Sequence, residues 1–534
     1  MDFDHNGMSR RSFLTATAAM GAVATLGLAG CGNSPKSSTS QATETTGDAP
    51  YPERDFAGRL SMSDFESSAA EPTPITKFDE EESYDVVVIG AGTGGVPAAI
   101  AAYEAGANVC LIQKEVNAVA QGTGCCYLNP ETTDELAAKH LMHSLREFCS
   151  YRSTWSLNNV WAENCAEAIT WYGEKTDEAG VPHNSKELGV FEYPEGSATT
   201  IMFDYEGGMN TPTVGLAEYF GDKVNVHYEC PGVQLVKDGD RVTGVFARRK
   251  DGTILKLNAS KGVIIATGDY QNNDNMVEKY LPNALPFEKK QMNKTGDGQL
   301  MGMMAGGLMQ NIGHTKMIHA KNWGANCTLF RDTPFLAVNL NGERFCAEDV
   351  GFYYRNNMVE WQPDGVWLCI IDSDFEAQAA AMGEKRLATL EDLQSAGEEG
   401  GVYTADTIEE LAGKIGVPAD ALTATVERYN ELATSGAGDL DFGKPTEYML
   451  PVQKAPFYAL HKEFAVSAIT SGLVINEHAQ VLDQERNPIE GLFAIGNCSG
   501  PFYGSIDYPM DIAGLSVSRC ITFGFVTGRY VASL

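Results

Sequence analysis

The sequence predicts an α/β fold: a Rossmann-like dinucleotide-binding domain that combines a parallel sheet with a β-meander. Three observations predict it. An apolar, strand-like run from Asp85 to Ile89 leads directly into a G-x-G-x-x-G sequence. Residues 223–261 alternate apolar and polar side chains between turn signals, as antiparallel strands do. A third apolar run, Gly262 to Gly268, predicts a buried strand that ends in a tight turn.

The glycine sequence consists of Gly90, Gly92 and Gly95, and it predicts a phosphate-binding turn. Gly90 permits the tight turn, Gly92 lets the backbone approach a pyrophosphate, and Gly95 lets the following helix pack close to the strand. The start of that helix offers free N–H groups and a positive dipole end. A second apolar strand, 108–113, completes the unit. It ends in Gln113, where such units usually carry an acid for the adenosine ribose, and a neutral amide oxygen is a weaker acceptor.

Length and net charge limit the number of domains and the kinds of binding partner to expect. A chain of 534 residues suggests two domains or more. A net charge of −32 argues against nucleic acid as a partner and against binding anionic lipid by charge alone. The acidity either serves solubility or favours a basic redox partner.

The cysteines predict neither a haem nor a metal site. The twelve cysteines contain no C-x-x-C and no C-x-x-C-H, so neither haem c attachment nor a ferredoxin-type cluster is expected. We expect the adjacent Cys125 and Cys126 to be small buried apolar residues.

The N-terminus resembles an export signal. Arg10 and Arg11 stand directly before the apolar stretch 13–30, as in a bacterial twin-arginine signal, which carries folded proteins. The stretch ends in a sequence that resembles a lipoprotein processing box with Cys31 as the lipidated residue. The alternative, a membrane-spanning anchor, would need about 20 apolar residues. We therefore expect residues 1–31 to be a signal that leaves the protein lipid-anchored on the outer face of the cytoplasmic membrane.

Residues 32–82 are predicted to be a disordered linker. They are rich in Ser, Thr, Pro and acidic side chains, and such a segment buries too little apolar surface to offset its ordering entropy.

Several later segments carry further glycine signals. Ala120 to Gly124 is a small-residue loop that could line a cofactor's phosphates or ring. Residues 131–180 have helical spacing. Thr295-Gly-Asp-Gly298 opens a helix, and Gly491 to Asn497 forms another apolar run near the end of the chain.

Five of these motifs, taken in order, resemble the FAD-dependent family of fumarate reductase flavoproteins, flavocytochromes c and 3-ketosteroid dehydrogenases, over residues 84–534. They are the strand with its glycine turn, the meander, Gly262 to Gly268, Thr295 to Gly298 and Gly491 to Asn497. The resemblance implies FAD as the cofactor. It also implies that the N-terminus of the last helix points at the flavin O2. The expected cofactor-binding residues are Gly90, Gly92, Gly95, Gln113, Lys114, Gln121, Gly122, Thr123, Gly124, Val233, Ala266, Thr267, Gly268, Asp297, Gly496, Asn497, Ala513, Gly514, Leu515 and Ser516.

The same resemblance implies an inserted α+β capping domain. We place the cap at 321–467, between a first part of the FAD-binding domain at 83–320 and a second part at 468–534. Closure of the cap over the flavin would exclude water from the reaction.

Three positions argue against fumarate as the substrate. Fumarate reductases hold a dicarboxylate with His and Arg residues, and a cap Arg delivers the proton. Here the proton-delivering position is Phe352, the paired His positions fall near Ser467 and Ala468, and the carboxylate-binding Arg is matched by Asp507. A buried Asp507 would repel a dicarboxylate.

Tyr508-Pro509 instead resembles the ketosteroid dehydrogenase branch. There the equivalent tyrosine and a backbone N–H bind the ketone oxygen of the substrate. A phenol with a pKa near 10 stays protonated at neutral pH, so it can donate to a developing enolate. A second tyrosine exchanges the proton in that branch. Tyr353 lies one residue from its position, with Tyr354 and Arg355 as competitors.

The expected function is reduction of an activated C=C bond in an enone or a phenolic or aryl alkene. Hydride would come from flavin N5, Tyr508 would polarise the conjugated oxygen, and Tyr353 or Arg355 would supply the proton. Since the chain has no haem motif, electrons would come from a cytochrome or a membrane quinol-linked protein, as in anaerobic respiration. Two alternatives remain: a ketosteroid-type dehydrogenase that runs the reverse reaction, and a flavin electron-transfer lipoprotein without substrate chemistry.

Overall fold

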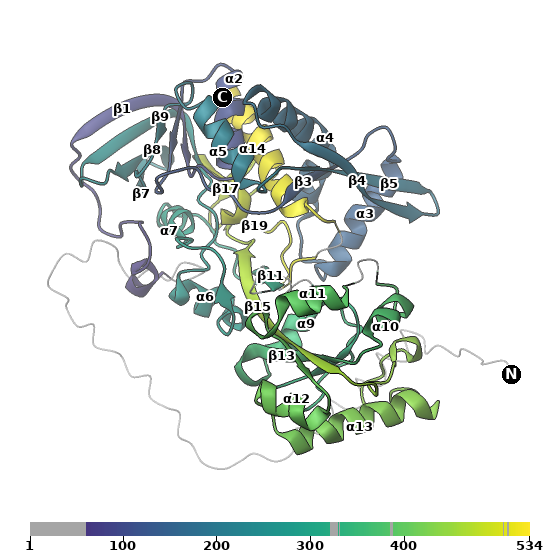
Figure 1. Cartoon of the computed structure of the whole chain (residues 1–534). Helices are drawn as coiled ribbons and strands as arrows, with labels where there is room; N and C mark the ends of the chain where they lie inside the picture. The colour runs from purple at the N-terminus through teal and green to yellow at the C-terminus, as the bar shows by residue number, and fades with distance from the viewer. Residues whose placement is uncertain (1–59, 321–328, 331, 385–387, 506, 510–511) are drawn as a thin grey trace, which may run out of the picture. The chain divides into compact units, whose positions relative to one another are not determined.

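The computed structural model describes residues 60–320, 329–330, 332–384, 388–505, 507–509 and 512–534 (Figure 1). The predicted export signal, 1–31, and the first part of the predicted linker lie outside the described residues.

The main sheet is built on β1 (Glu80–Ile89), which lies parallel between β2 (Val109–Ile112) and β9 (Ile254–Ile265). Its strand order is β17-β18-β9-β1-β2-β6. The other strands in this order are β17 (Gln480–Leu482), β18 (Pro488–Ala494) and β6 (Val226–His227), and two more strands of the same sheet, described next, lie off this path. Val86 to Ile89 are buried, as expected of an apolar run inside a parallel sheet. The carboxyl ends of β1, β2, β9 and β18 therefore meet at one edge.

The predicted meander is confirmed. β7 (Gly232–Asp238), β8 (Arg241–Arg248) and β9 pair antiparallel in sequence order. The two turns fall at 238–241 and 249–253, where Asp-Gly pairs supply the required backbone freedom. Strand β9 pairs parallel with β1 from Leu255 to Ile265, and its first half also pairs antiparallel with β8, so it joins the meander to the parallel sheet.

Helices α2 (Gly95–Glu104) and α14 (Leu515–Ser533) lie side by side next to this sheet (Figure 1). They approach closely because the facing residues are small. A Cβ on Gly524 would lie 2.4 Å from the Gly94 carbonyl oxygen, and one on Gly528 would lie 2.3 Å from the Ala98 oxygen. Helix α4 (Trp155–Glu178) packs on α14 as well, and Trp161 donates to the Ser518 hydroxyl. With α3 (Glu135–Phe148), it confirms the predicted helical stretch.

A three-stranded antiparallel sheet follows the order β3 (Gly124–Leu128), β5 (Gly196–Asp204), β4 (Asn184–Tyr193). Cys125 and Cys126 lie on β3 and are fully buried free thiols, as predicted. The shorter elements of this part of the chain are α5 (Asn210–Tyr219), α6 (Asp274–Tyr280), α7 (Asp297–Met304), β16 (Leu473–Val474) and β19 (Ser499–Gly500).

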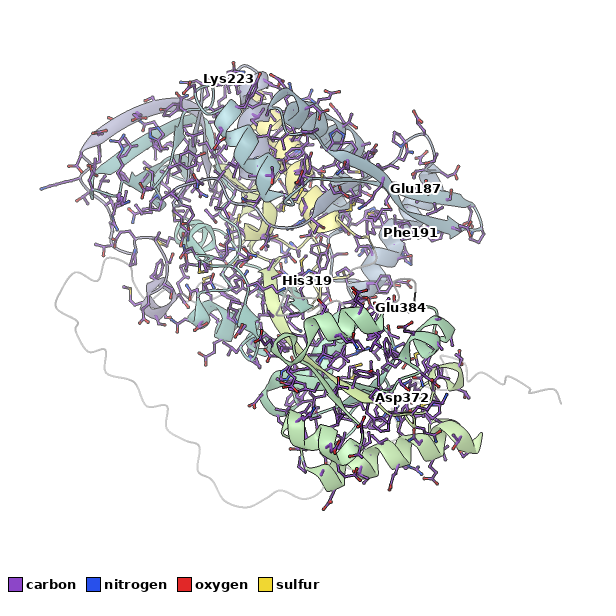
Figure 2. All side chains as sticks on the ribbon, in the orientation of Figure 1. Glu187, Phe191, Lys223, His319, Asp372 and Glu384 are labelled. Carbon is purple, nitrogen blue, oxygen red and sulfur yellow. The ribbon has the colours of Figure 1, made fainter. Side chains whose placement is uncertain are left out.

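The predicted cap corresponds to a sheet centred on β15 (Phe457–Ile469) with helices around it. Its other strands are β10 (Glu288–Lys289), β11 (Lys316–Ala320), β12 (Leu336–Val338), β13 (Val366–Ile371) and β14 (Val402–Ala405). Its helices are α9 (Phe352–Val359), α10 (Phe375–Ala381), α11 (Leu390–Ala396), α12 (Ile408–Ile415) and α13 (Ala419–Ser435). Asp372, labelled in Figure 2, accepts hydrogen bonds from the N–H groups of Gln453 and Lys454 and so ties the end of β13 to the approach to β15.

Strand β15 continues past residue 467, and its last residues pair with β10 and β11. The predicted domain boundaries therefore fall inside one sheet, and the division at 321 and 467 stays a prediction.

The prediction of a disordered linker up to residue 82 is wrong for its described part, 60–82. The buried Asp64 pairs with Lys279 at 3.1 Å, and the side chain of Gln234 bonds the backbone at three nearby positions, Glu71, Thr73 and Ile75. Strand β1 itself begins at Glu80. The segment has little apolar surface of its own, but the folded body supplies partners for its polar groups, which its composition does not reveal.

Candidate cofactor groove and active site

A groove runs along the edge where β1, β2, β9 and β18 end. Most of the predicted cofactor-binding residues line it: Gly90, Gly92, Gln113, Lys114, Gln121, Ala266, Thr267, Gly268, Asp297, Gly496 and Asn497. These residues come from six separate segments of the chain, which the fold brings to one edge of the sheet, and their contact with a cofactor stays a prediction.

The glycine turn leaves no room for side chains. Gly90 has a φ of +108°, and a Cβ there would lie 2.5 Å from the Ala266 carbonyl oxygen. A Cβ on Gly95 would lie 1.8 Å from the Gly90 oxygen. Gly95 therefore does not line the groove; it lets the first turn of α2 sit against the end of β1, as predicted.

Gln113 and Lys114 end the second strand. The Gln113 amide bonds the Asn117 carbonyl oxygen and the Lys114 N–H. Lys114 Nζ donates to Thr295 Oγ1 at 2.9 Å and to Asp297 Oδ2 at 3.0 Å. Burial alone would raise the pKa of Asp297, but Lys114 and the surrounding donors hold it below its ordinary value. Since Ser68 and Ala69 also donate to Asp297, its carboxylate is engaged by protein groups and positions Lys114 at the groove.

Two charged residues of the groove were missed in the sequence. Lys294 and Asp269 both line it; Asp269 is buried and Lys294 is half-buried. Burial lowers the pKa of Lys294, against the opposing field of Asp269, and burial raises the pKa of Asp269. Asp269 directly follows the predicted turn at Gly268, and Lys294 directly precedes the Thr295–Gly298 motif, so both could have been found by their positions.

Four other predicted cofactor-binding residues do not line the groove. Gly124 begins β3, and a Cβ there would lie 2.4 Å from the Phe203 carbonyl oxygen. Val233 is buried in β7, and its carbonyl oxygen accepts the Glu71 N–H at 2.7 Å. Gly122 and Thr123 are exposed beside the groove loop. A cofactor contact at these four positions stays a prediction.

The donor set fits FAD. A pyrophosphate carries negative charge, and the groove presents the cations Lys114 and Lys294 beside a glycine turn and the start of a helix. The Gln121 Oε1 atom is buried without a hydrogen-bond partner within the described part of the chain. A buried polar atom of this kind is satisfied when a ligand supplies a donor.

Tyr508 lies at the start of the last helix. Its hydroxyl oxygen accepts the Ser516 N–H at 3.1 Å, within the first turn of α14. Gly514 caps that turn with a φ of +81°, next to the exposed Ala513 and the buried Leu515. Burial raises the pKa of Tyr508, while the Tyr503 hydroxyl and the Ser516 N–H act in the opposite direction. The Ser516 N–H is thus bonded to the Tyr508 hydroxyl itself, and joint binding of a ketone oxygen by this tyrosine and a backbone N–H stays a prediction.

Helix α9 carries the other predicted catalytic residues. Arg355 is buried, its Nη2 donates to the carbonyl oxygens of Glu348 and Val350, and its guanidinium lies 4.9 Å from the Trp367 ring. Tyr353 is half-buried and packs against Tyr354. The guanidinium of Arg355 is thus held inside the cap, an arrangement that favours Tyr353 for proton delivery.

A buried ion pair links α9 to Tyr508. Lys316, on β11, is fully buried and pairs with Asp507 at 3.1 Å. Asn357 of α9 accepts from Lys316 Nζ at 2.8 Å and donates to Asp507 Oδ2 at 2.5 Å. The Tyr508 N–H in turn donates to the Lys316 carbonyl oxygen. Sequence reasoning found Asp507 but missed its partner, which lies 191 residues away.

The paired-His positions carry no imidazole. Ser467 and Ala468 are both buried in β15. Among the described residues, no group of three or more His, Cys, Asp or Glu side chains could hold a metal ion. None of the helices in the described ranges has the length and apolar character needed to cross a membrane.

Residues 85–506 match the FAD binding domain family. A vinyl phenol reductase of Lactiplantibacillus plantarum is 25% identical over 486 residues, which cover 84% of this chain and 96% of that protein. Two solved structures are similar in fold. The open conformation of a flavocytochrome c3 fumarate reductase has a TM-score of 0.66 at 23% identity, over 85% of this chain and 78% of that one. The 3-ketosteroid delta1-dehydrogenase from Sterolibacterium denitrificans has a TM-score of 0.67 at 20% identity, over 84% and 99%.

The family match covers well over half of the chain and includes the glycine turn, the cap and the ion pair's Lys316. The predicted α/β fold, the FAD cofactor and the oxidoreductase class are confirmed. The chain is an FAD-dependent oxidoreductase that belongs to the FAD binding domain family.

Proposed function

We propose that the protein reduces a C=C bond conjugated to a carbonyl or phenolic group. The observation that carries the proposal is the Tyr508 hydroxyl, whose oxygen accepts the Ser516 N–H, so that its own proton is directed away from that nitrogen. A buried phenol that is raised in pKa stays protonated at neutral pH and can donate to an oxygen that becomes negative in the transition state.

Bound FAD supplies the hydride. Tyr508 polarises the conjugated oxygen of the substrate, and the Ser516 N–H strengthens the Tyr508 hydroxyl as a donor because it withdraws electron density from its oxygen. Tyr353 supplies the proton to the neighbouring carbon. Tyr353 and Asn357 are four residues apart on α9 and so share a face, and Asn357 contacts Asp507, the residue before Tyr508.

The substrate is neutral at the end that Tyr508 contacts. A fumarate-type site needs cations there. Among the described residues near Tyr508, Lys316 is already paired with Asp507 and bonded to Asn357, and the buried Arg519 is bonded to Asn497 between two aromatic rings. The vinyl phenol reductase, similar over nearly its whole length, suggests a phenolic alkene as the first substrate to test.

The electron source and the location are also proposals. The twin-arginine sequence at Arg10-Arg11 and the box ending at Cys31 support export and a lipid anchor on the outer face of the cytoplasmic membrane. At that place a cytochrome or a quinol-linked membrane protein would be the donor. The net charge of −32 favours a donor with a basic docking surface.

The test follows reoxidation of the FAD-loaded protein after anaerobic chemical reduction. The oxidants are 4-vinylphenol, an α,β-unsaturated ketosteroid, a cinnamate-type acid and fumarate. Fast reoxidation by the two neutral compounds supports the proposal. Fast reoxidation by fumarate alone would contradict the assigned substrate class, and no reoxidation by any of them would favour an electron-transfer protein.

A further inference from the structure

A second feature of α14, the buried Arg519, has no role in the reaction described above. Its side chain is 2% exposed. One guanidinium nitrogen, Nη2, donates to Asn497 Oδ1 at 2.7 Å, and the Nε atom is buried without a hydrogen-bond partner among the described residues. The guanidinium carbon lies 5.4 Å from the centres of both the Phe502 and the Tyr503 rings.

The charge of this arginine is not balanced by the protein. No Asp or Glu within the described ranges forms an ion pair with Arg519, whereas Lys316, Arg344 and Lys444 each have a carboxylate within 3.2 Å. The buried Arg355 instead donates to two backbone carbonyl oxygens inside the cap, away from the cofactor groove. Two aromatic rings and one amide oxygen compensate a buried charge only in part. A buried cation in this state predicts an anionic partner that binds beside it.

The position of Arg519 points to the cofactor as that partner. Its neighbours Asn497 and Cys520 both line the cofactor groove. Arg519 lies one helical turn beyond Leu515 and Ser516, the start of α14. Its charge also reaches the Tyr503–Tyr508 pair, where it acts to lower the pKa of both phenols. The start of α14 is the part of the chain that the family resemblance places at the flavin ring, and Arg519 lies about one helical turn from it.

We propose that Arg519 stabilises the negative charge that FAD carries after it takes up two electrons and one proton. The electrons come from the donor and the proton from water, so the cofactor gains one unit of negative charge next to a pre-existing cation. The cation beside this new negative charge raises the reduction potential of bound FAD. The inference rests on the proposed function, and a raised potential favours its reductive direction. The alternative anion is the FAD pyrophosphate, which carries the same charge in both oxidation states.

The experiment measures the reduction potential of bound FAD by anaerobic equilibration with a reference dye, together with the dissociation constants of oxidised and reduced FAD. We expect Arg519→Gln to weaken the binding of reduced FAD about tenfold relative to oxidised FAD, as a lost opposite charge does. For a two-electron couple this is a potential about 30 mV lower. Arg519→Lys, which keeps the charge, should retain most of the wild-type potential.

Two further variants make the result independent of folding defects. Asn497→Asp places a carboxylate on the Arg519 guanidinium and should lower the potential with the arginine still present. The control is Arg529→Gln on the same helix, because Arg529 is exposed and paired with Glu167. It should leave the potential unchanged.

An unchanged potential in Arg519→Gln and Asn497→Asp would overturn the inference. An equal loss of affinity for oxidised and reduced FAD would also overturn it and assign Arg519 to the pyrophosphate. The measurement uses no alkene, so its result does not depend on the proposed substrate class. A wrong substrate class and a wrong role for Arg519 are therefore distinguishable.

Discussion

The Tyr508 hydroxyl oxygen lies 3.1 Å from the Ser516 backbone nitrogen and accepts its hydrogen bond. This contact joins the residue that polarises the substrate to the positive end of α14, a helix that also carries Arg519 one turn later. Because the phenol oxygen is already an acceptor, its own proton points elsewhere. The site is thus built around a neutral hydrogen-bond donor, the Tyr508 hydroxyl.

The Lys316–Asp507 pair should be essential for the fold around Tyr508. Lys316→Met leaves a buried, unpaired Asp507, and breaking a buried pair in this way costs about 3 to 5 kcal/mol in the free energy of unfolding. Lys316→Met/Asp507→Leu removes both charges and should recover most of the loss. Denaturant unfolding of the two single variants and the double variant checks this, and strictly additive losses would show that the pair is not coupled.

Tyr353 should deliver the proton. Tyr353→Phe should slow reoxidation by an alkene by about 10² to 10⁴, the usual worth of a positioned proton donor. Arg355→Lys should leave the chemical step nearly unchanged, because the Arg355 guanidinium bonds backbone carbonyls inside the cap. Stopped-flow reoxidation in H₂O and D₂O separates the two. A large loss in Arg355→Lys together with a normal rate in Tyr353→Phe would reverse the assignment.

His314 should make the protein less stable in mild acid. The ring is buried, its Nδ1 bonds the Tyr270 hydroxyl and its Nε2 bonds the Gln310 carbonyl oxygen, so the neutral ring is the form that fits. Burial lowers the pKa of His314 from 6.5 to about 4. The unfolded chain therefore binds a proton first as the pH falls. Stability is fully present above pH 6.5 and is lost between there and pH 4, by about 3 kcal/mol in all.

Unfolding free energies between about pH 4 and pH 7.5 test this, with His314→Gln as the comparison. The variant should be less stable at the neutral end of this range but should have a smaller slope with pH. Equal slopes in the two proteins would mean that another group is responsible.

Gly95→Ala should abolish FAD binding, since its Cβ would lie 1.8 Å from the Gly90 oxygen and would push the helix away from the glycine turn. Gly413→Ala is the matched control. Gly413 lies inside α12, and a Cβ added there would meet no atom within 4 Å, so alanine should raise stability by about 0.5 to 1 kcal/mol. FAD absorbance after gel filtration and thermal unfolding distinguish the two. Retained FAD in Gly95→Ala would contradict the geometry of the turn.

The sequence was most informative where structure is local. The strand, the glycine turn and the helix at 85–104 follow from contacts between near neighbours, and so do the meander turns at 238–241 and 249–253. Tyr508 could be placed because its motif adjoins the last helix. The order of the motifs then brought most of the groove together, including Gln121 and Asn497.

What the sequence did not reveal depends on contacts between distant residues. Lys316 meets Asp507 across 191 positions, and Lys294 joins Gly90 and Gln113 in the groove from a distant part of the chain. The ordered part of the predicted linker is held by Gln234 and Asp297, which no composition rule could anticipate. Arg519 belongs to no motif, and its lack of a counter-charge depends on which residues the fold places around it.

The central claim, that Tyr508 activates a neutral conjugated substrate, is tested most directly by one comparison. Wild type and Tyr508→Phe are loaded with FAD, reduced without oxygen and mixed with 4-vinylphenol, and the rate of flavin reoxidation is measured. We expect fast reoxidation in the wild type and a loss of about 10² to 10³ in Tyr508→Phe, with FAD binding retained. Equal rates in the two proteins would contradict the claim.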